Sequence, residues 1–293
     1  MSSLFVLLLA AVLATSSARC GAPGDELVVR TFEICHDTVG NPWRGEEFGI
    51  ALAELRLEYR LRHRDPASPT SLFGQWNTGS RHEPFAGDDD ALPPYRDPWG
   101  RLFFEREAED GSWSVADTNG VHWLLCRVDD DTSDRDRPPR FPRYELSRDG
   151  EVEASFTAAA ATLPGLAAAW VHGDTCVVEY RYSDYQKLPD RSWSPLYRRV
   201  LVNGRDLGTE GSYASCFGFI YLEGRPFFFF ERDGEVGCRY DGRDILFDVD
   251  LLFRDVCCES ARWSPYFTRG GFEAIGRRDD TWLLIYGTVI PIP

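Results

Sequence analysis

The side chains best suited to chemistry in this sequence are aspartates in short runs. One run holds Asp129, Asp131 and Asp134, and its opening, Asp129-x-Asp131-x-Ser133, resembles the start of an EF-hand loop. Carboxylates at alternate positions can surround calcium with the hard oxygen ligands that this ion prefers. The run lacks the glycine at the sixth place and the closing glutamate, so a solvated acidic loop is the alternative interpretation. Calcium is the only cofactor that the sequence suggests.

Glycoside cleavage is a second chemistry, which needs carboxylates gathered around one cavity. The candidates are Asp37, Glu105, Glu179 and Glu231. Glu105 and Glu231 each stand in a Phe-Glu-Arg triplet, where an ion pair with the adjacent Arg106 or Arg232 is the structural interpretation. The sequence contains no Gly-x-Ser-x-Gly, His-Glu-x-x-His, P-loop or Gly-x-Gly-x-x-Gly motif, and its five histidines lack metal-ligand spacing. The catalytic residues of an enzyme therefore stay unassigned.

Aromatic side chains have two interpretations. Five tryptophans offer flat surfaces on which sugars stack: Trp99, Trp113, Trp123, Trp193 and Trp263. Repeat proteins built of strands also bury many aromatic residues between sheets, and this alternative places the tryptophans in the core. The block Phe227–Phe230 cannot face one side of a strand, because successive side chains alternate. It predicts a strand that is buried on both faces.

The cysteines indicate disulfides. The eight are Cys20, Cys35, Cys126, Cys176, Cys216, Cys238, Cys257 and Cys258, and an even count in a secreted chain favours disulfides whose pairing the sequence leaves open. No Cys-x-x-Cys motif supports a zinc ribbon or a redox pair. The adjacent Cys257 and Cys258 rarely bond to each other, because their Cα atoms lie too close for relaxed geometry. A link from Cys20 or Cys35 to this pair would tie the two ends of the chain together.

The first residues predict secretion. Leu4–Leu13 is an apolar run, and the small Ser16 and Ala18 favour cleavage before Arg19. The run is shorter than the roughly 20 residues that span a bilayer. The sequence therefore predicts a signal peptide over residues 1–18, a single all-β repeat domain over 19–293 and an extracellular location. The net charge of -15, without basic clusters, disfavours nucleic acid and anionic lipid and leaves a protein or carbohydrate ligand as the expected partner.

The elements that must position these residues are strands. Between Leu55 and Arg62 apolar and charged residues alternate, which predicts a strand with one buried face. Other strands are predicted at Leu27–Phe32, His122–Arg127, Thr175–Tyr182, Arg198–Val202, Phe217–Leu222, Pro226–Glu231 and Thr281–Tyr286. The alanine-rich stretch Phe156–Ala169 is the best helix candidate, but Pro164-Gly165 interrupts it and favours a loop or short turn.

Hairpin dipeptides separate the strands. They are Asn119-Gly120, Asp149-Gly150, Asn203-Gly204, Glu223-Gly224, Asp233-Gly234 and Asp241-Gly242, all suited to the positive φ of tight turns. From Cys216 to Asp250 they alternate with strands, so this stretch predicts a four-stranded antiparallel meander.

Several segments recur. Gly100–Arg106 returns at Gly224–Arg232, and Asn203–Leu207 returns at Asp241–Ile245. Gly111 to Gly150 is 39 residues, Gly150 to Gly234 is 84 and Gly100 to Gly224 is 124, all near multiples of 41. A recurrence of this length with four strands per unit is typical of β-propeller blades. The sequence predicts an all-β, propeller-like fold with five or six four-stranded antiparallel blades, and a β-sandwich is the alternative.

One segment carries a family resemblance. Gly224–Gly234, followed by Tyr240-Asp241-Gly242 and then Cys257-Cys258, resembles a group of uncharacterised β-propeller-like proteins over the last third of the chain. The shared motifs are strands and turns, so the resemblance implies a fold and no catalytic residue. We expect a secreted, disulfide-containing binding or structural module. The alternative is a carbohydrate-active hydrolase or lyase with carboxylates at the propeller centre.

Overall fold

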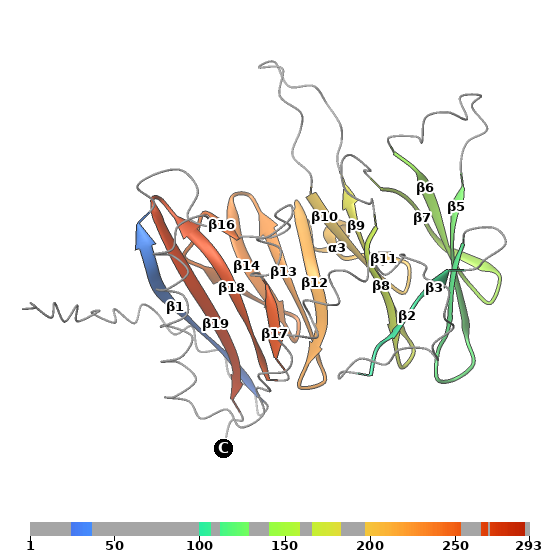
Figure 1. The fold of residues 1–293 in the computed structure, drawn as a ribbon, viewed down its shortest axis with the longest axis horizontal. Helices are drawn as coiled ribbons and strands as arrows, with labels where there is room; N and C mark the ends of the chain where they lie inside the picture. The colour runs from blue at the N-terminus through green and yellow to red at the C-terminus, as the bar shows by residue number, and fades with distance from the viewer. Residues whose placement is uncertain are drawn as a thin grey trace, which may run out of the picture. The chain divides into compact units, whose positions relative to one another are not determined.

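The computed structural model describes residues 25–36, 100–106, 112–128, 141–158, 166–182, 197–252, 265–268 and 270–290. Over these ranges the chain forms nineteen strands and one short helix, and the strands make four antiparallel sheets (Figure 1). The predicted all-β class is confirmed. Within the same ranges, no helix has the length and apolar character needed to cross a bilayer.

The chain divides into two compact units. The central unit is Pro69–Phe247, and the terminal unit combines Met1–Ser68 with Asp248–Pro293. The single domain expected over residues 19–293 stays a prediction.

The central unit contains three sheets, which we number along the chain. Sheet I has the spatial order β3-β4-β5-β6-β7, sheet II the order β2-β8-β9-β10-β11, and sheet III the order β12-β13-β14-β15. Sheet I is built from β3 (Glu105–Arg106), β4 (Trp113–Ala116), β5 (His122–Val128), β6 (Arg143–Arg148) and β7 (Glu151–Thr157). Sheet II is built from β2 (Leu102–Phe103), β8 (Leu166–His172), β9 (Thr175–Tyr182), β10 (Tyr197–Val202) and β11 (Arg205–Asp206). Sheet III is built from β12 (Ser215–Leu222), β13 (Arg225–Arg232), β14 (Glu235–Tyr240) and β15 (Arg243–Phe247).

The helix α3 (Leu207–Gly211) follows β11. The side chain of Asp206 caps it by accepting hydrogen bonds from the backbone N–H groups of Gly208 and Thr209. Such a cap satisfies N–H groups that have no partner inside the helix. This short helix has no counterpart among the sequence predictions.

The terminal unit has one sheet, in which both ends of the chain pair. Its spatial order is β1-β19-β18-β16, with β17 also pairing with β18. The strands are β1 (Glu26–His36), β16 (Leu251–Leu252), β17 (Tyr266–Thr268), β18 (Gly271–Arg278) and β19 (Thr281–Ile290). β1 runs antiparallel to β19 along its whole length, from Glu26 opposite Ile290 to His36 opposite Thr281. The N-terminal strand therefore completes a sheet made of C-terminal residues.

Sheet III is the meander that the sequence predicts. Its turns are Glu223-Gly224, Asp233-Gly234 and Asp241-Gly242, and all six residues have positive φ, from 47° to 82°. Two successive left-handed residues make a type I′ turn, whose twist matches that of the flanking strands. The turn dipeptides therefore determine these hairpins locally. Asn119-Gly120 differs, since only its glycine has positive φ.

The other predicted strands within the described ranges are confirmed. Each lies inside an observed strand, namely β1, β5, β9, β10, β12, β13 or β19. The strand predicted over Leu55–Arg62 lies outside the described residues. The stretch Phe156–Ala169, expected to be a loop or short turn, begins in β7 and ends in β8.

One sequence repeat is not a structural repeat. In Gly100–Arg106, Leu102–Phe103 pairs with β8 of sheet II, whereas Glu105–Arg106 pairs with β4 of sheet I. In Gly224–Arg232 the matching residues form one continuous strand, β13. The interpretation of these segments as equivalent is wrong, because a short run of strand-forming residues pairs with whichever strand the tertiary structure brings beside it.

The recurring hairpin turns are structurally equivalent in two sheets. Asn203–Leu207 and Asp241–Ile245 both follow the turn into the last strand of their sheets, β11 and β15. The strands β5, β9 and β13 each pair with the strand before and the strand after them along the chain, and they begin 53 and 50 residues apart. The structural spacing is thus longer than the 41 residues that the sequence suggests.

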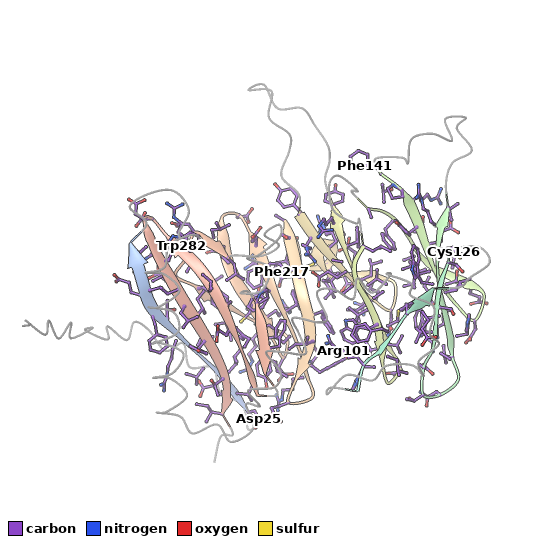
Figure 2. All side chains as sticks on the ribbon, viewed as in Figure 1. Asp25, Arg101, Cys126, Phe141, Phe217 and Trp282 are labelled. Carbon is purple, nitrogen blue, oxygen red and sulfur yellow. The ribbon has the colours of Figure 1, made fainter. Side chains whose placement is uncertain are left out.

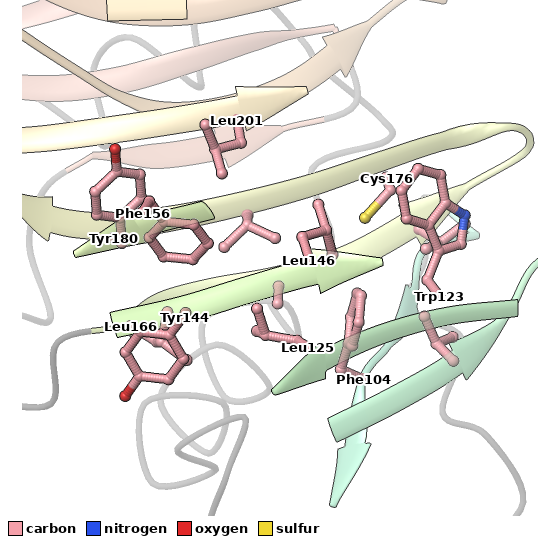
Figure 3. Packing of buried hydrophobic residues seen from close by; sticks show 14 of the residues in the cluster. Phe104, Trp123, Leu125, Tyr144, Leu146, Phe156, Leu166, Cys176, Tyr180 and Leu201 are labelled. Carbon is pink, nitrogen blue, oxygen red and sulfur yellow. The ribbon is translucent and has the colours of Figure 1, made fainter. Parts of the chain in front are cut away.

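Side chains of sheets I and II form one buried cluster, shown in Figure 3. Trp123, Leu125 and Leu146 contribute from sheet I, and Cys176 and Val178 from sheet II. Each fully buried apolar side chain of this size contributes about 1.5–3 kcal/mol to folding. Sheets I and II therefore pack face to face.

Sheets II and III share a second cluster. Val177 of β9 and Val200 of β10 pack there with Phe228 and Phe230 of β13. Because β9 directs Val177 and Val178 to opposite clusters, sheet II is buried on both faces. All four side chains of Phe227–Phe230 are buried, which confirms the prediction of a strand covered on both faces.

Candidate functional site

The best-organised polar group of the central unit surrounds Glu179. This residue follows Val178 on β9, so its side chain points with Val177 toward sheet III. Its Oε1 pairs with Nη1 of Arg198 at 2.5 Å, and its Oε2 accepts a hydrogen bond of 2.9 Å from the backbone N–H of Gly218 on β12. Both carboxylate oxygens therefore have partners inside the protein.

A β-bulge in β12 brings the Gly218 N–H to this position. Phe217 lies opposite Phe229 and Ile220 opposite Phe227, so two residues of β12 stand opposite one residue of β13. Gly218 has φ of +66°, which a residue without Cβ adopts at little cost. This is the geometry of a glycine bulge, in which the strand bends and one residue leaves the regular pairing.

Further hydrogen bonds join the same two sheets. The buried hydroxyl of Ser215 accepts from the backbone N–H of Arg198 at 3.0 Å and donates to its carbonyl at 3.4 Å. The hydroxyls of Thr175 and Tyr221 share a hydrogen bond of 2.9 Å. We call Glu179, Arg198, Ser215 and Gly218 the Glu179 cluster. One carboxylate and one guanidinium balance each other in it, so its chemistry suits holding sheet II to sheet III.

A second polar group lies on sheet III. Asp244 of β15 accepts hydrogen bonds from the Tyr213 hydroxyl at 2.8 Å, from Nη1 of Arg239 at 2.8 Å and from Nη1 of Arg232 at 3.1 Å. Burial raises the pKa of Tyr213, and its bond to Asp244 acts in the same direction. Burial lowers the pKa of Arg239, but its bonds to Tyr213 and Asp244 outweigh that effect and raise it overall. The hydrogen bonds of this group therefore stabilise the charged forms of Asp244 and of the two arginines.

The carboxylates proposed for glycoside cleavage do not form one site within the described residues. Glu105 is exposed on β3, and Glu179 is buried between sheets II and III. Glu231 lies on the face of β13 opposite Phe230, which packs toward sheet II, so sheet III separates it from Glu179. Asp37 lies outside the described residues. Arg232 forms its ion pair with Asp244 of β15. The prediction that Arg232 pairs with the adjacent Glu231 is therefore wrong.

The calcium candidates Asp129, Asp131 and Asp134 lie outside the described residues, so that hypothesis stays a prediction. Across the ranges that the structure does describe, no group of three histidine, cysteine, aspartate or glutamate side chains is placed to hold a metal ion.

The tryptophans that the structure describes are structural. Trp123 is fully buried in the core between sheets I and II, and Trp113 packs half-buried against the same core. Trp282, labelled in Figure 2, is buried on β19 of the terminal unit. The core interpretation is confirmed for Trp123, which has no surface for a sugar. Trp99, Trp193 and Trp263 lie outside the described residues.

Three cysteines are buried thiols: Cys176, Cys216 and Cys238. Burial raises the pKa of all three, to about 12 for Cys216, because the thiolate loses its hydration in the core. These three side chains form no disulfide in the structure, and the disulfides expected from the cysteine count stay a prediction for the chain. Cys126 is half-buried on β5 (Figure 2). The side chains of Cys20, Cys35, Cys257 and Cys258 lie outside the described part of the chain.

Sequence reasoning found Glu179 but missed its partners. A glycine inside the strand Ser215–Leu222 is a known signal of a bulge, and Gly218 could have been identified in this way. Asp244 stands in the recurring segment Asp241–Ile245, which marked it as part of a repeated hairpin. No local signal indicates that Arg198 and Ser215 meet. A comparison of the chain with protein-family models, curated proteins and solved structures finds no match.

Proposed function

We propose that this chain is a secreted, β-propeller-like protein that acts as a binding or structural module. The central unit supports the fold: three successive antiparallel sheets pack face to face, with one buried cluster between each neighbouring pair. The terminal unit adds a second argument. Its sheet is completed by β1, so both ends of the chain meet in one sheet, as ring closure in a propeller requires.

The spacing of the strands supports five blades. In each of the four sheets we compare one strand that is paired on both sides, and these strands, β5, β9, β13 and β18, begin 53, 50 and 46 residues apart. Between His36 and Gly100 the sequence has 63 further residues, enough for one more unit of this length. The alternating pattern of Leu55–Arg62 is the sequence signal for a strand within that unit.

The Glu179 cluster is the observation that supports a module over an enzyme. A general acid or nucleophile needs a carboxylate oxygen that can reach a substrate. Among the three candidates that the structure describes, Glu179 is the buried carboxylate, and its two oxygens are engaged by Arg198 and by Gly218. The buried Glu179 carboxylate therefore favours a role in holding the sheets together over a role in catalysis.

Secretion and disulfides belong to the same proposal. The three buried thiols leave five cysteines: Cys126 on β5, and Cys20, Cys35, Cys257 and Cys258, whose positions fall in the terminal unit. Expression through a secretory pathway should release a chain that begins at Arg19, as N-terminal sequencing would determine.

A paired assay tests the function. The purified protein is applied to a glycan array and to a panel of oligosaccharides, with the variants Glu105→Gln and Glu231→Gln alongside. If the protein is a binding module, we expect saturable binding to the glycan array and no cleavage of the oligosaccharides. Both variants should give the same result as the unchanged protein. Hydrolysis or elimination of an oligosaccharide that either variant abolishes would overturn it in favour of a carbohydrate-active enzyme.

A further inference from the structure

The sequence contains two Asn-Gly dipeptides, and the structure places them in opposite environments. In this dipeptide the backbone nitrogen of the glycine can attack the asparagine side-chain carbonyl. A C–N bond closes a five-membered succinimide, ammonia leaves, and water opens the ring to aspartate or isoaspartate. The glycine favours attack because it has no Cβ to obstruct it. The reaction requires an asparagine side chain that is able to turn toward the next residue.

Asn203 is held in place. Its Oδ1 accepts a hydrogen bond of 2.7 Å from the backbone N–H of Cys176, and its own N–H donates to the Cys176 carbonyl at 2.8 Å. The turn itself is crowded, because a Cβ on Gly204 would lie 2.9 Å from the carbonyl oxygen of Glu153. Before the Gly204 nitrogen could attack, the hydrogen bond between Asn203 Oδ1 and the Cys176 N–H would have to break. The turn, which is packed against β7, would also have to distort.

Asn119 is held by its backbone alone. It lies exposed in the loop Asp117–Gly120 between β4 and β5, where its N–H donates to Oδ1 of Asp117 at 2.7 Å. Within the described part of the chain, its side-chain amide makes no hydrogen bond. The space around the next residue is open, since a Cβ on Gly120 would meet nothing within 4 Å. One bond opposes the reaction, from the Gly120 N–H to the Asp117 carbonyl at 3.1 Å.

We propose that Asn119-Gly120 is a site of spontaneous deamidation in the folded protein and that Asn203-Gly204 is protected. The product carries one more negative charge at the β4–β5 loop. In its isoaspartyl form it also has one more carbon in the backbone of that loop. The inference is independent of the proposed function, because it rests on the two turns alone.

Peptide mapping by mass spectrometry tests the proposal. The folded protein is held in mildly alkaline buffer prepared with heavy-oxygen water, so that each opened succinimide incorporates one labelled oxygen. Conversion of Asn203 should be at least about tenfold slower than that of Asn119, because its side chain must first leave the Cys176 amide. The urea-unfolded protein is the control, in which both sites should convert at similar rates.

A variant completes the test. Asn119→Gln should remove the rapid labelling of the β4–β5 peptide and leave the Asn203 peptide unchanged, since the six-membered ring that glutamine would form closes slowly. Equal rates at the two sites in the folded protein would overturn the proposal. So would an Asn119 that stays intact while the unfolded control converts.

Discussion

Replacing Glu179 with alanine would remove one half of the ion pair between sheets II and III. Both side chains are largely shielded from solvent, with 11% of each exposed. Removing one member of a buried pair takes a close partner from the other charge, at a typical cost of about 3–5 kcal/mol in the free energy of unfolding. The Gly218 N–H would lose its acceptor as well, so we expect a loss in the upper part of that range.

The assay is urea unfolding followed by tryptophan fluorescence and circular dichroism. The control is Glu210→Ala, because Glu210 pairs with Arg205 at the similar distance of 2.6 Å but with 41% and 74% of the two side chains exposed. Exposed pairs contribute about 0–1 kcal/mol, so this control should change stability little.

A double-mutant cycle then separates the pair from its surroundings. Glu179→Ala combined with Arg198→Ala should cost less than the sum of the single changes, because each single change already removes the contact between the two side chains. If Glu179→Ala lowers the free energy of unfolding no more than Glu210→Ala does, the Glu179 cluster does not hold sheets II and III together.

Three other predictions follow from buried groups and backbone conformation. The three buried thiols should resist alkylation in the folded protein and react fully once it is unfolded in urea; labelling of the native protein at any of them would contradict their placement. Stability should fall as the pH rises from about 9 to about 12, because folded Cys216 keeps a proton that the unfolded chain releases. This thiol contributes up to about 1.4 kcal/mol per pH unit to the slope, and Cys216→Ala should reduce the slope by that contribution in urea titrations at each pH. Gly218→Ala should lower the free energy of unfolding by about 1–2 kcal/mol, since its φ of +66° is strained for a residue with Cβ, and an unchanged urea midpoint would count against the bulge.

The strands and hairpins could be predicted because their signals are local. Alternation of apolar and polar residues has the period of a strand, and Asp233-Gly234 supplies the positive φ that a tight turn needs. The predicted strand over Thr175–Tyr182 matches β9 at both ends. The meander of sheet III was predicted as a whole, since each of its strands pairs with the next one along the chain.

The repeat at Gly100–Arg106 shows where local signals stop. Its residues favour a strand as strongly as those of Gly224–Arg232, but the chain leaves sheet II after Phe103 and enters sheet I at Glu105. Which strand lies beside these residues depends on segments far along the sequence, such as β8. The equivalence of Glu105 and Glu231 could not be judged without that information.

By itself, the sequence determined the all-β class, most of the described strands and the type I′ turns, because backbone conformation and side-chain alternation depend on neighbouring residues. Only the tertiary structure decided that Glu179 meets Arg198 and Gly218, and that Cys176 is a buried thiol. Both outcomes depend on contacts between distant segments and on the loss of water around each group, and neither quantity is encoded in the spacing of residues along the chain.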